Sequence, residues 1–344
     1  MVAVSAATGG ARNQVPLSRA TPGGQPGCGE RSGRDSPPTG GGCIQLSWRV
    51  PGTRRLVCDA EQERGKGEEP LPEAETIEVL VLVKAAPVMT QDLDETMCIA
   101  GVRVDGHRRE WVRLHPVPFR DLADESRFTK YQVIRLQVIQ HRSDRRPETW
   151  TPLYGTIQPR HSVGAQHGWA ARRPYIQALG QRTMCELLEL NEGGSGPGVP
   201  SLATVRPVLP LKLLITERER DQLEKWQARA DAAAARPSLF DDPARPKPPF
   251  EVVPWRFSYR YRCEQRGCRG HEQTIVDWEA ATLWRHVRNQ QNWRDAMVAK
   301  FEQEMWQGHD SLLFVGNMEQ YPNSFLVLGV FWPPSGDVQG VLDV

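Results

Sequence analysis

The chain has 344 residues, 39% hydrophobic and 25% charged, which is the composition of a folded globular protein and excludes a wholly disordered or membrane-embedded one. Its 43 Lys and Arg residues almost balance its 42 Asp and Glu residues, so overall charge cannot draw it to nucleic acid or anionic lipid. Any nucleic-acid site must therefore be a local basic patch.

Three sequence features predict a cytoplasmic protein without a membrane partner. No apolar run approaches the ~20 residues of a membrane-spanning helix. The first residues lack a basic segment followed by a sustained hydrophobic core, so we expect no secretory signal. The seven cysteines are scattered and odd in number, which favours a reducing compartment, where closely spaced cysteines are more often metal ligands than disulfides.

Residues 1–74 are rich in glycine, proline and charge. Such a segment buries too little apolar surface to offset the entropy of ordering, so we predict a disordered N-terminal extension. Its cysteines, Cys28, Cys43 and Cys58, lie far apart in the sequence and have no nearby histidine. We expect no metal site there.

Four strands are predicted at the start of the ordered region, which we place at 75–235. They cover residues 77–84, 97–104, 109–117 and 131–140. The second and third flank an Asp-Gly pair, which favours a tight hairpin turn. No helix separates the first three strands, and no Gly-rich phosphate loop follows the first, which counts against ATP or NAD. The pattern predicts an α+β protein with an antiparallel OB-like β-barrel.

The sequences VLVLVKAA, CIAG and EWVRLHPV, within residues 77–118, resemble the N-terminal half of a poorly characterised bacterial family, the dual-OB-containing domain proteins. In that family a first strand is followed by a Cys-Ile-Ala-Gly segment and a Trp-hydrophobic-Arg-Pro-like strand. Here Leu114 and His115 stand where the family pattern more often continues directly to proline. The resemblance implies paired OB-type barrels and no established activity.

Helical and strand patterns alternate after the predicted barrel. Residues 175–190 have an amphipathic helical pattern, and 211–215 have the pattern of a strand. Thr216 and Glu219 form a capping box for a following helix. The proline-rich segment 236–250 is a predicted linker or loop. It separates the barrel from a second unit at 251–344, mixed in strands and helices, which we expect to be OB-like or held by a metal.

Residues 255–262 alternate between aromatic and mainly basic side chains. The aromatic set is Trp255, Phe257, Tyr259 and Tyr261, and the other is Arg256, Ser258, Arg260 and Arg262. On a strand these sets lie on opposite faces. Exposed aromatics could stack on unpaired bases, but burial is favoured because four exposed rings would form a costly patch. The arginines can contact phosphates in either case.

A basic loop after the fourth strand contains Arg142, Arg145 and Arg146. Arginine presents a rigid donor fork to phosphate oxygens, so this loop is a second candidate for nucleic-acid contact. The alternative is a solvated turn that Asp144 partly neutralises.

Cys263, Cys268 and His271 follow the aromatic strand in the pattern C-x4-C-x2-H. Thiolates and imidazole this close in sequence can converge on one tetrahedral zinc ion. Three ligands do not close such a site, and the candidates for the fourth are His286, Asp277 and Cys185, or a water as in catalytic sites. A structural zinc is favoured over free thiols and over catalytic zinc.

Glu272, Asp277 and Glu279 are the candidate catalytic residues, because clustered carboxylates can hold the magnesium of a nuclease. Asp277 is equally explained as the cap of a helix. The favoured function is binding of single-stranded or structured nucleic acid through the arginines. The alternatives are a metal-dependent nuclease or other hydrolase in defence or repair, and a protein-interaction module.

Overall fold

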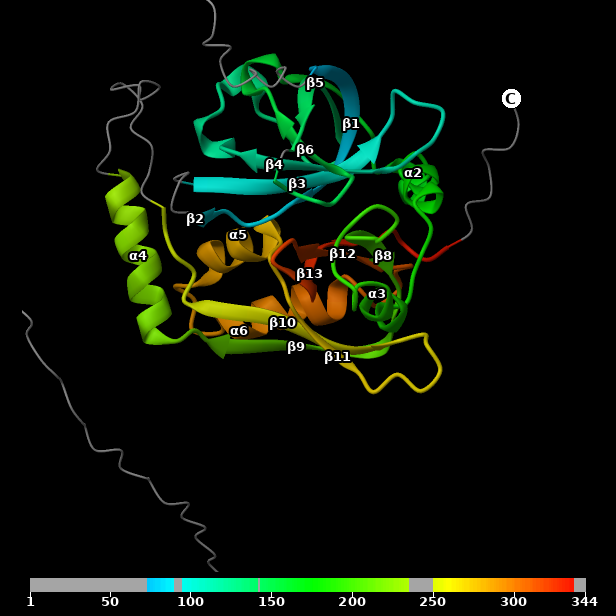
Figure 1. Ribbon diagram of the computed structural model, residues 1–344. Coiled ribbons are helices and arrows are strands. Elements are labelled where there is room, and N and C mark those ends of the chain that lie inside the picture. Colours follow the sequence, from blue (N-terminus) through cyan, green and yellow to red (C-terminus); the bar gives the residue numbers. More distant parts are fainter. Residues whose placement is uncertain (1–72, 90–94, 142, 235–249, 337–344) are drawn as a thin grey trace, which may run out of the picture. The chain divides into compact units, whose positions relative to one another are not determined.

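The computed structural model describes residues 73–89, 95–141, 143–234 and 250–336 (Figure 1). The predicted disorder of 1–74 lies almost wholly outside these residues, as do most of the predicted linker 236–250 and Arg142. The described residues form a mixed α+β fold with a closed β-barrel, two smaller sheets and short helices, which confirms the predicted fold class.

The first sheet closes into a five-stranded barrel. Its strands are β1 (Glu75–Lys84), β3 (Glu95–Arg103), β4 (Trp111–Val117), β5 (Gln132–Gln140) and β6 (Thr149–Pro152). Strand β1 pairs antiparallel with both β3 and β5, and β6 joins β5 antiparallel and β4 parallel, which completes the ring. This is a small Greek-key barrel of the OB type. The short strands β2 (Val88–Met89) and β7 (Gln158–Ser162) extend its edges.

Alternate residues of the barrel strands fill its interior. Ile77, Val79 and Val81 of β1 are fully buried there with Ile134 of β5. Strands β1 and β3 approach closely at Gly101, where a Cβ atom would overlap the backbone of Leu80. The branched residues that predicted these strands thus form their core, since successive side chains point to opposite faces.

The outer face of the barrel packs against a second sheet. Leu82 and Val102 share a hydrophobic cluster with Leu328, which lies on that sheet. Trp111 meets Phe314 edge to face, with ring centroids 5.9 Å apart. This contact covers part of the strand face through which OB folds commonly bind oligonucleotides.

Two three-stranded antiparallel sheets make up the second half. One contains β9 (Pro207–Glu217), β10 (Trp255–Cys263) and β11 (His271–Thr274), and the other contains β8 (Leu202–Val205), β12 (Leu312–Met318) and β13 (Tyr321–Phe331). Strands β8 and β9 precede the proline-rich segment, yet they pair with strands that follow it. Backbone pairing therefore joins residues that the sequence assigned to different units.

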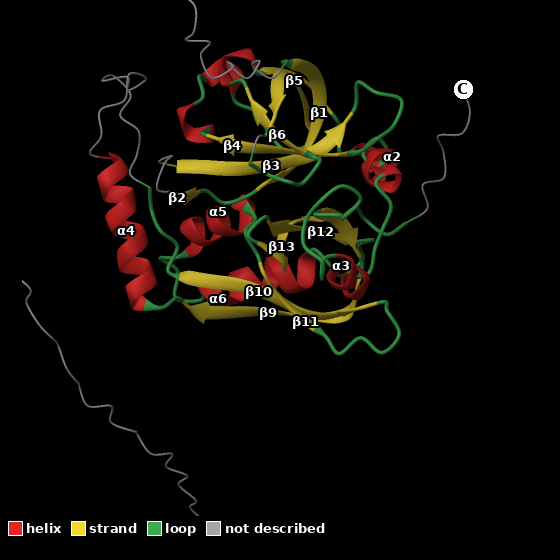
Figure 2. Ribbon diagram, in the orientation of Figure 1, coloured by secondary structure: helices red, strands yellow, loops and turns green. Residues whose placement is uncertain are grey.

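Short helices accompany the strands (Figure 2). They are α1 (Gln166–Trp169), α2 (Arg173–Ala178), α3 (Met184–Leu190), α4 (Arg220–Ala234), α5 (Trp278–Val287) and α6 (Trp293–Val298), a π-helical turn η4 (Ala299–Glu304), and the 3-10 turns η1 (Phe119–Asp121), η2 (Asp124–Ser126) and η3 (Tyr154–Thr156). None of the helices in the described ranges is both long enough and apolar enough to cross a membrane.

Two helix predictions were wrong in detail. The helix predicted at 175–190 is two helices, because Gly180 has a positive φ of 70° and Thr183 caps a new helix by accepting a hydrogen bond from the Glu186 amide. Thr216 does not cap α4, because it lies in β9 opposite Arg256. Backbone pairing with a distant strand overrides the local capping signal there.

His115 of β4 stacks on His141, with ring centroids 6.5 Å apart. Burial, together with the charges of His141 and Arg113, lowers the pKa of His115 to about 4. The unfolded state, with a pKa near ~6.5, therefore binds a proton that the folded state does not. The stability contributed by neutral His115 is complete above about pH 6.5 and is lost as the pH falls toward 4.

Replacing His115 by Gln should therefore flatten the acid dependence of stability. Between about pH 7 and 4.5 we expect the parent to lose about 2 kcal/mol more than H115Q, after allowing for the partly exposed ring. Urea denaturation of both proteins at the two pH values measures the difference. Equal losses in the two proteins would contradict the prediction.

Candidate metal centre and basic face

Four side chains, Cys185, Cys263, Cys268 and His271, converge so that their ligand atoms all lie within 4.8 Å of one another. Cys185 Sγ lies 3.6 Å from both Cys263 Sγ and His271 Nε2, and Cys268 Sγ lies 3.1 Å from His271 Nε2. Tetrahedral coordination with bonds of about 2.0–2.3 Å places ligand atoms roughly 3.5–3.8 Å apart. The two 3.6 Å separations match this range and the 3.1 Å separation is shorter, so the cluster fits one tetrahedral metal ion after a small shift of Cys268 or His271.

Three of the four ligands come from the β10–β11 hairpin. Cys263 ends β10, His271 begins β11, and Cys268 lies in the turn between them. Gly267 and Gly270 in this turn have positive φ angles of 79° and 103°, which a residue with a Cβ adopts only with strain. The two glycines let the turn bring its ligands together.

The fourth ligand, Cys185, comes from α3. This helix is held beside the hairpin by its cap residue, since Thr183 Oγ1 donates a hydrogen bond of 3.1 Å to Gln265 Oε1 in the turn. Because 78 residues separate Cys185 from Cys263, the sequence indicates Cys185 only as one of three candidate side chains for this position. Contact between α3 and the hairpin, rather than spacing, identifies it.

The other two candidates for the fourth ligand lie elsewhere. His286 is exposed on α5, and its Nδ1 lies 3.3 Å from the Thr282 carbonyl oxygen. Asp277 pairs with Lys130. Neither belongs to the cluster, so the proposed ligation by His286 has no support from the geometry.

The electrostatics of the cluster favour a bound cation. Burial, and then the neighbouring thiols of Cys263 and Cys268, raise the pKa of Cys185. Burial alone would also raise the pKa of Cys268, but backbone hydrogen bonds, including one from the Gly270 amide, outweigh it and lower that pKa. A divalent cation removes the repulsion among the sulfur atoms, because a coordinating thiol is deprotonated outright.

Protein atoms can fill all four positions of this centre. Catalytic zinc sites keep one position for water or substrate, whereas structural sites are closed by four protein ligands. With Cys185 as the fourth ligand, a metal ion bound here would have the coordination of a structural centre and would join α3 to the hairpin.

Three of the four aromatic side chains of β10 lie in the core, as expected, and the fourth, Trp255, is half-buried against Trp293. Phe257, Tyr259 and Tyr261 are at most 4% exposed. Tyr259 donates a hydrogen bond of 2.6 Å to the Phe301 carbonyl oxygen and meets Trp306 edge to face. These rings are not available to stack on bases.

The opposite face of β10 is exposed and basic. Arg256, Arg260 and Arg262 all point to solvent. Arg260 pairs with Glu272 at 2.9 Å, but both side chains are more than half exposed, so this ion pair is weak. Arg262 forms no ion pair with any residue that the structure describes.

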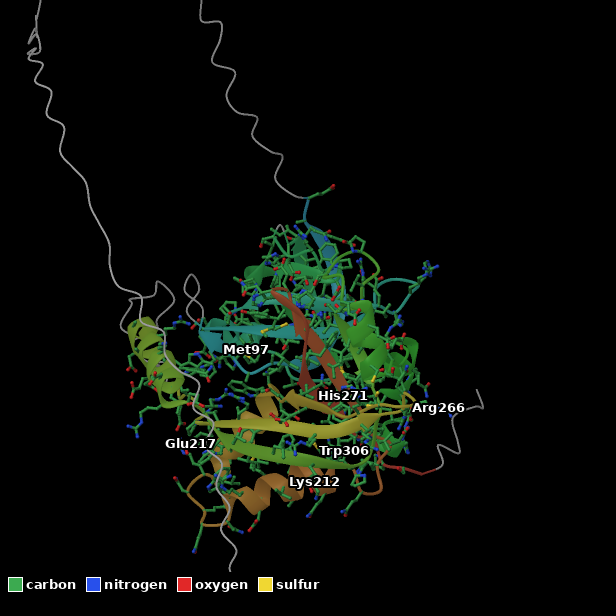
Figure 3. All side chains as sticks on the ribbon, turned by 60° about the horizontal axis from the view of Figure 1, so that its bottom comes forward. Met97, Lys212, Glu217, Arg266, His271 and Trp306 are labelled. Atoms are coloured by element: carbon green, nitrogen blue, oxygen red, sulfur yellow. The ribbon has the colours of Figure 1, made fainter. Side chains whose placement is uncertain are left out.

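The turn after β10 adds Arg266 and Arg269, both exposed and likewise unpaired with other described residues. Figure 3 shows Arg266 at the outer end of the hairpin, beyond His271. Glu264 is the single acidic residue among 262–271. Residues 263–271, which a metal ion bound at the cluster would hold and which we call the metal-held turn, therefore continue the basic face of β10.

The basic loop at 141–146 has a structural role for one of its arginines. Arg146 is buried, pairs with Asp144 at 2.6 Å and donates a hydrogen bond of 2.6 Å to the Asn317 carbonyl oxygen. Arg145 is exposed. Arg146 therefore ties the loop to β12 and is not free to contact phosphate, while Arg145 remains a candidate and Arg142 lies outside the described residues.

The three candidate catalytic carboxylates do not form an ion site. Glu272 pairs with Arg260. Asp277 is 2% exposed and caps α5 by accepting a hydrogen bond from the Glu279 amide, which confirms the predicted capping role. Within the described ranges, the Cys and His cluster is the one group of three or more ligating side chains that can hold a metal ion.

Comparison with known protein families divides the chain near residue 179. Residues 75–178 match a domain of unknown function (DUF8758), and residues 180–343 match a second domain of unknown function (DUF8757). Two uncharacterised domains thus cover residues 75–343. No curated protein matches the chain. The resemblance to the dual-OB-containing family remains a prediction.

The boundary between the two domains agrees with the strand pairing described above. The first domain contains the barrel, and the second contains both three-stranded sheets and all four side chains of the Cys and His cluster. The proline-rich segment 236–250, where the sequence suggested a division, lies inside the second domain.

Proposed function

We propose that the protein binds nucleic acid, single-stranded or structured, through the arginines of β10 and the metal-held turn, with zinc as the structural ion of the Cys3His centre. Three exposed arginines without acidic partners among the described residues carry this proposal: Arg262, Arg266 and Arg269. Phosphate contacts dominate the affinity of such interfaces, and arginine suits them because its donor fork matches phosphate oxygens.

A fixed backbone favours binding by this turn. Ligation of Cys263, Cys268 and His271 to one ion would hold the turn in a single conformation. The arginines between these ligands would then lose little additional backbone entropy on binding. The metal thus positions the basic side chains without contacting the nucleic acid itself.

Zinc fits the ligands better than other common ions. Three thiolates and one imidazole form a known structural zinc set, whereas magnesium and calcium require oxygen ligands. The thiols must be reduced to bind it, which agrees with the cytoplasmic location expected from the cysteine content.

The barrel is the less suitable surface for nucleic acid. Arg113 of β4 donates hydrogen bonds of 3.1 and 2.8 Å to the carbonyl and hydroxyl oxygens of Ser201, and Trp111 packs on Phe314. These contacts cover much of the strand face that other OB folds use. On the basic side of β10, Ser258 is buried, but Arg256, Arg260 and Arg262 are exposed.

The triple variant Arg262→Gln, Arg266→Gln and Arg269→Gln tests the proposal. We expect roughly tenfold to hundredfold weaker binding of a fluorescent single-stranded oligonucleotide near 50 mM salt. The slope of log K against log salt should become shallower by about 2, since each lost contact with a single strand contributes about 0.7. Fluorescence anisotropy across a salt series measures both quantities.

A matched control removes the same charge elsewhere, by replacing the exposed Arg135, Arg220 and Arg229 with Gln. It should bind with nearly the parent salt slope. Zinc content and circular dichroism should be unchanged in both triple variants, because no ligand is altered. Equal weakening by both triple variants, or a parent protein that does not bind, would refute the proposed interface.

A further inference from the structure

A cavity of about 370 Å³ opens at the junction of the barrel with the second domain. It lies beside the short pairing of β4 with β6, which covers two residue positions and is extended by the hydrogen bond from the Arg113 amide to the Glu148 carbonyl oxygen. Trp111, Pro147 and Ser201 line the cavity. At this volume it accepts a ligand at the small end of those that proteins enclose.

The lining combines aromatic rings with hydrogen-bond acceptors. Trp111, Trp150, Glu110 and Glu148 all line the cavity. Glu110 is exposed at the entrance, while the Glu148 side chain is only 12% exposed. This lining suits a flat aromatic ligand that carries hydrogen-bond donors. The indole rings can stack on the face of the ligand, and the carboxylates can accept hydrogen bonds from the donors at its edge.

Two neighbouring residues, Ser201 and Arg113, fix the position of the Glu148 carboxylate. One oxygen accepts a hydrogen bond from the Ser201 hydroxyl and lies 3.8 Å from Arg113 Nη2. The other oxygen, Oε2, has no hydrogen-bond partner among the described residues. A preformed acceptor thus remains for a ligand that enters the cavity.

The cavity adjoins the metal-held turn. Arg182 lines its rim, and the next residue, Thr183, contacts Gln265 in the turn at 3.1 Å. The turn that carries Arg266 and Arg269 is thus in contact, through Thr183, with the segment that lines the cavity. Continuity between a basic surface and an aromatic cavity is the arrangement by which proteins hold single strands.

We infer that this cavity takes one unpaired nucleobase with an exocyclic amino group, cytosine foremost, from a strand bound along the metal-held turn. Carboxylates accept hydrogen bonds from the N4 amino group of cytosine, which uracil lacks. The inference rests on the proposed function, because a bound strand supplies the nucleobase. The residues that line the cavity are nevertheless different from the arginines that carry the proposed function.

Two variants test the cavity without altering the arginines. Glu110→Gln removes one acceptor charge at the exposed rim, and Val199→Trp fills the cavity from its lining. We expect the parent to bind deoxycytidine oligomers about tenfold more tightly than deoxyuridine oligomers of equal length. Both variants should lose most of this preference while their salt slopes stay unchanged. Glu125→Gln, on the exposed turn η2, is the matched control and should keep the preference.

Photo-cross-linking gives a readout that does not depend on affinity. An oligomer with one 5-iododeoxycytidine should cross-link to the peptides that contain Trp111 or Trp150, and V199W should suppress this product. Retention of the cytosine preference by both variants, or cross-links confined to other peptides, would overturn the inference.

A further experiment tests nucleobase binding by the cavity separately from oligonucleotide binding by the arginines. If the parent binds no oligomer, saturation-transfer NMR with free deoxycytidine tests the cavity alone. A signal in the parent that disappears in V199W would support it, and no signal would overturn it. A signal from butylamine but none from deoxycytidine would assign the cavity to cationic ligands and also overturn it.

Discussion

Loss of the metal ion from the Cys3His centre should destabilise the second domain by at least about 4 kcal/mol, because metal binding is coupled to the folding of such sites. Cys263 is 3% exposed, and the nearby Cys185 and Cys268 sulfur atoms would remain crowded against it. Without the ion, the turn would also lose the ligation that fixes Gly267 and Gly270 in their positive-φ conformations. We expect chelation to lower Tm by roughly 10 °C or more.

Paired substitutions separate ligation from general damage. Cys185→Ser and His271→Asn should reduce the zinc content well below one ion per chain and lower Tm as chelation does. Cys98→Ser changes the remaining cysteine among those described, and His286→Asn changes the histidine that sequence spacing suggested; both should keep the zinc. Elemental analysis and differential scanning calorimetry provide the measurements.

The decisive result concerns the metal-free protein. If it unfolds at the same temperature as the protein with zinc, the four side chains do not form a structural centre. Loss of zinc in H286N with retention in C185S would instead show that α5, and not α3, supplies the fourth ligand.

Lys130→Met should be the second most damaging change, costing about 3–5 kcal/mol. Lys130 Nζ lies 3.1 Å from both oxygens of Asp277, and the two side chains are 11% and 1% exposed. Removing the lysine leaves a buried carboxylate without its cation. Urea denaturation at neutral pH measures the cost.

The pH dependence of the stability of K130M tests whether the buried charge of Asp277 causes the loss. Burial raises the pKa of Asp277 to about 6 even beside Lys130, and without the lysine it should rise further. A folded pKa above the unfolded value of ~3.9 means that the folded state binds more protons between the two. Compared with the parent, K130M should therefore be least destabilised below about pH 4. Its free energy of unfolding should fall as the pH rises through the folded-state pKa of Asp277.

Two further variants complete this test. In Lys130→Met with Asp277→Asn, the buried charge is gone and the amide oxygen can still cap α5, so part of the lost stability should return. Glu272→Gln breaks the exposed pair with Arg260 and should cost less than about 1 kcal/mol. A cost for K130M as small as that of E272Q would show that the pair between the two domains contributes little.

Strands and buried faces were largely predictable because they depend on neighbours in sequence. Alternation over 255–262 predicted which side of β10 is mainly buried, and the sequence predicted four of the five barrel strands, β1, β3, β4 and β5. Asp277 was correctly predicted as a helix cap, because its partner, the Glu279 amide, is two residues away. Each of these signals acts within about one turn or strand.

In the basic loop, neighbouring residues in the sequence do not indicate which arginine is buried. Arg145 and Arg146 are adjacent and chemically identical, yet Arg145 is exposed and Arg146 is buried against Asp144 and the Asn317 carbonyl oxygen. The latter partner is 171 residues away. Their different roles depend on how the second domain packs against the loop, and residue type carries no signal of that.

The sequence by itself determined three of the four members of the candidate metal centre, since Cys263, Cys268 and His271 are near enough in the chain to chelate one ion together. Only the tertiary structure decided the fourth, because α3 must pack on the hairpin to deliver Cys185. The cavity likewise belongs to the tertiary structure alone: its walls come from the end of a strand pairing and from segments of both domains. Contacts between distant segments create such sites, and they leave no periodic pattern in the chain.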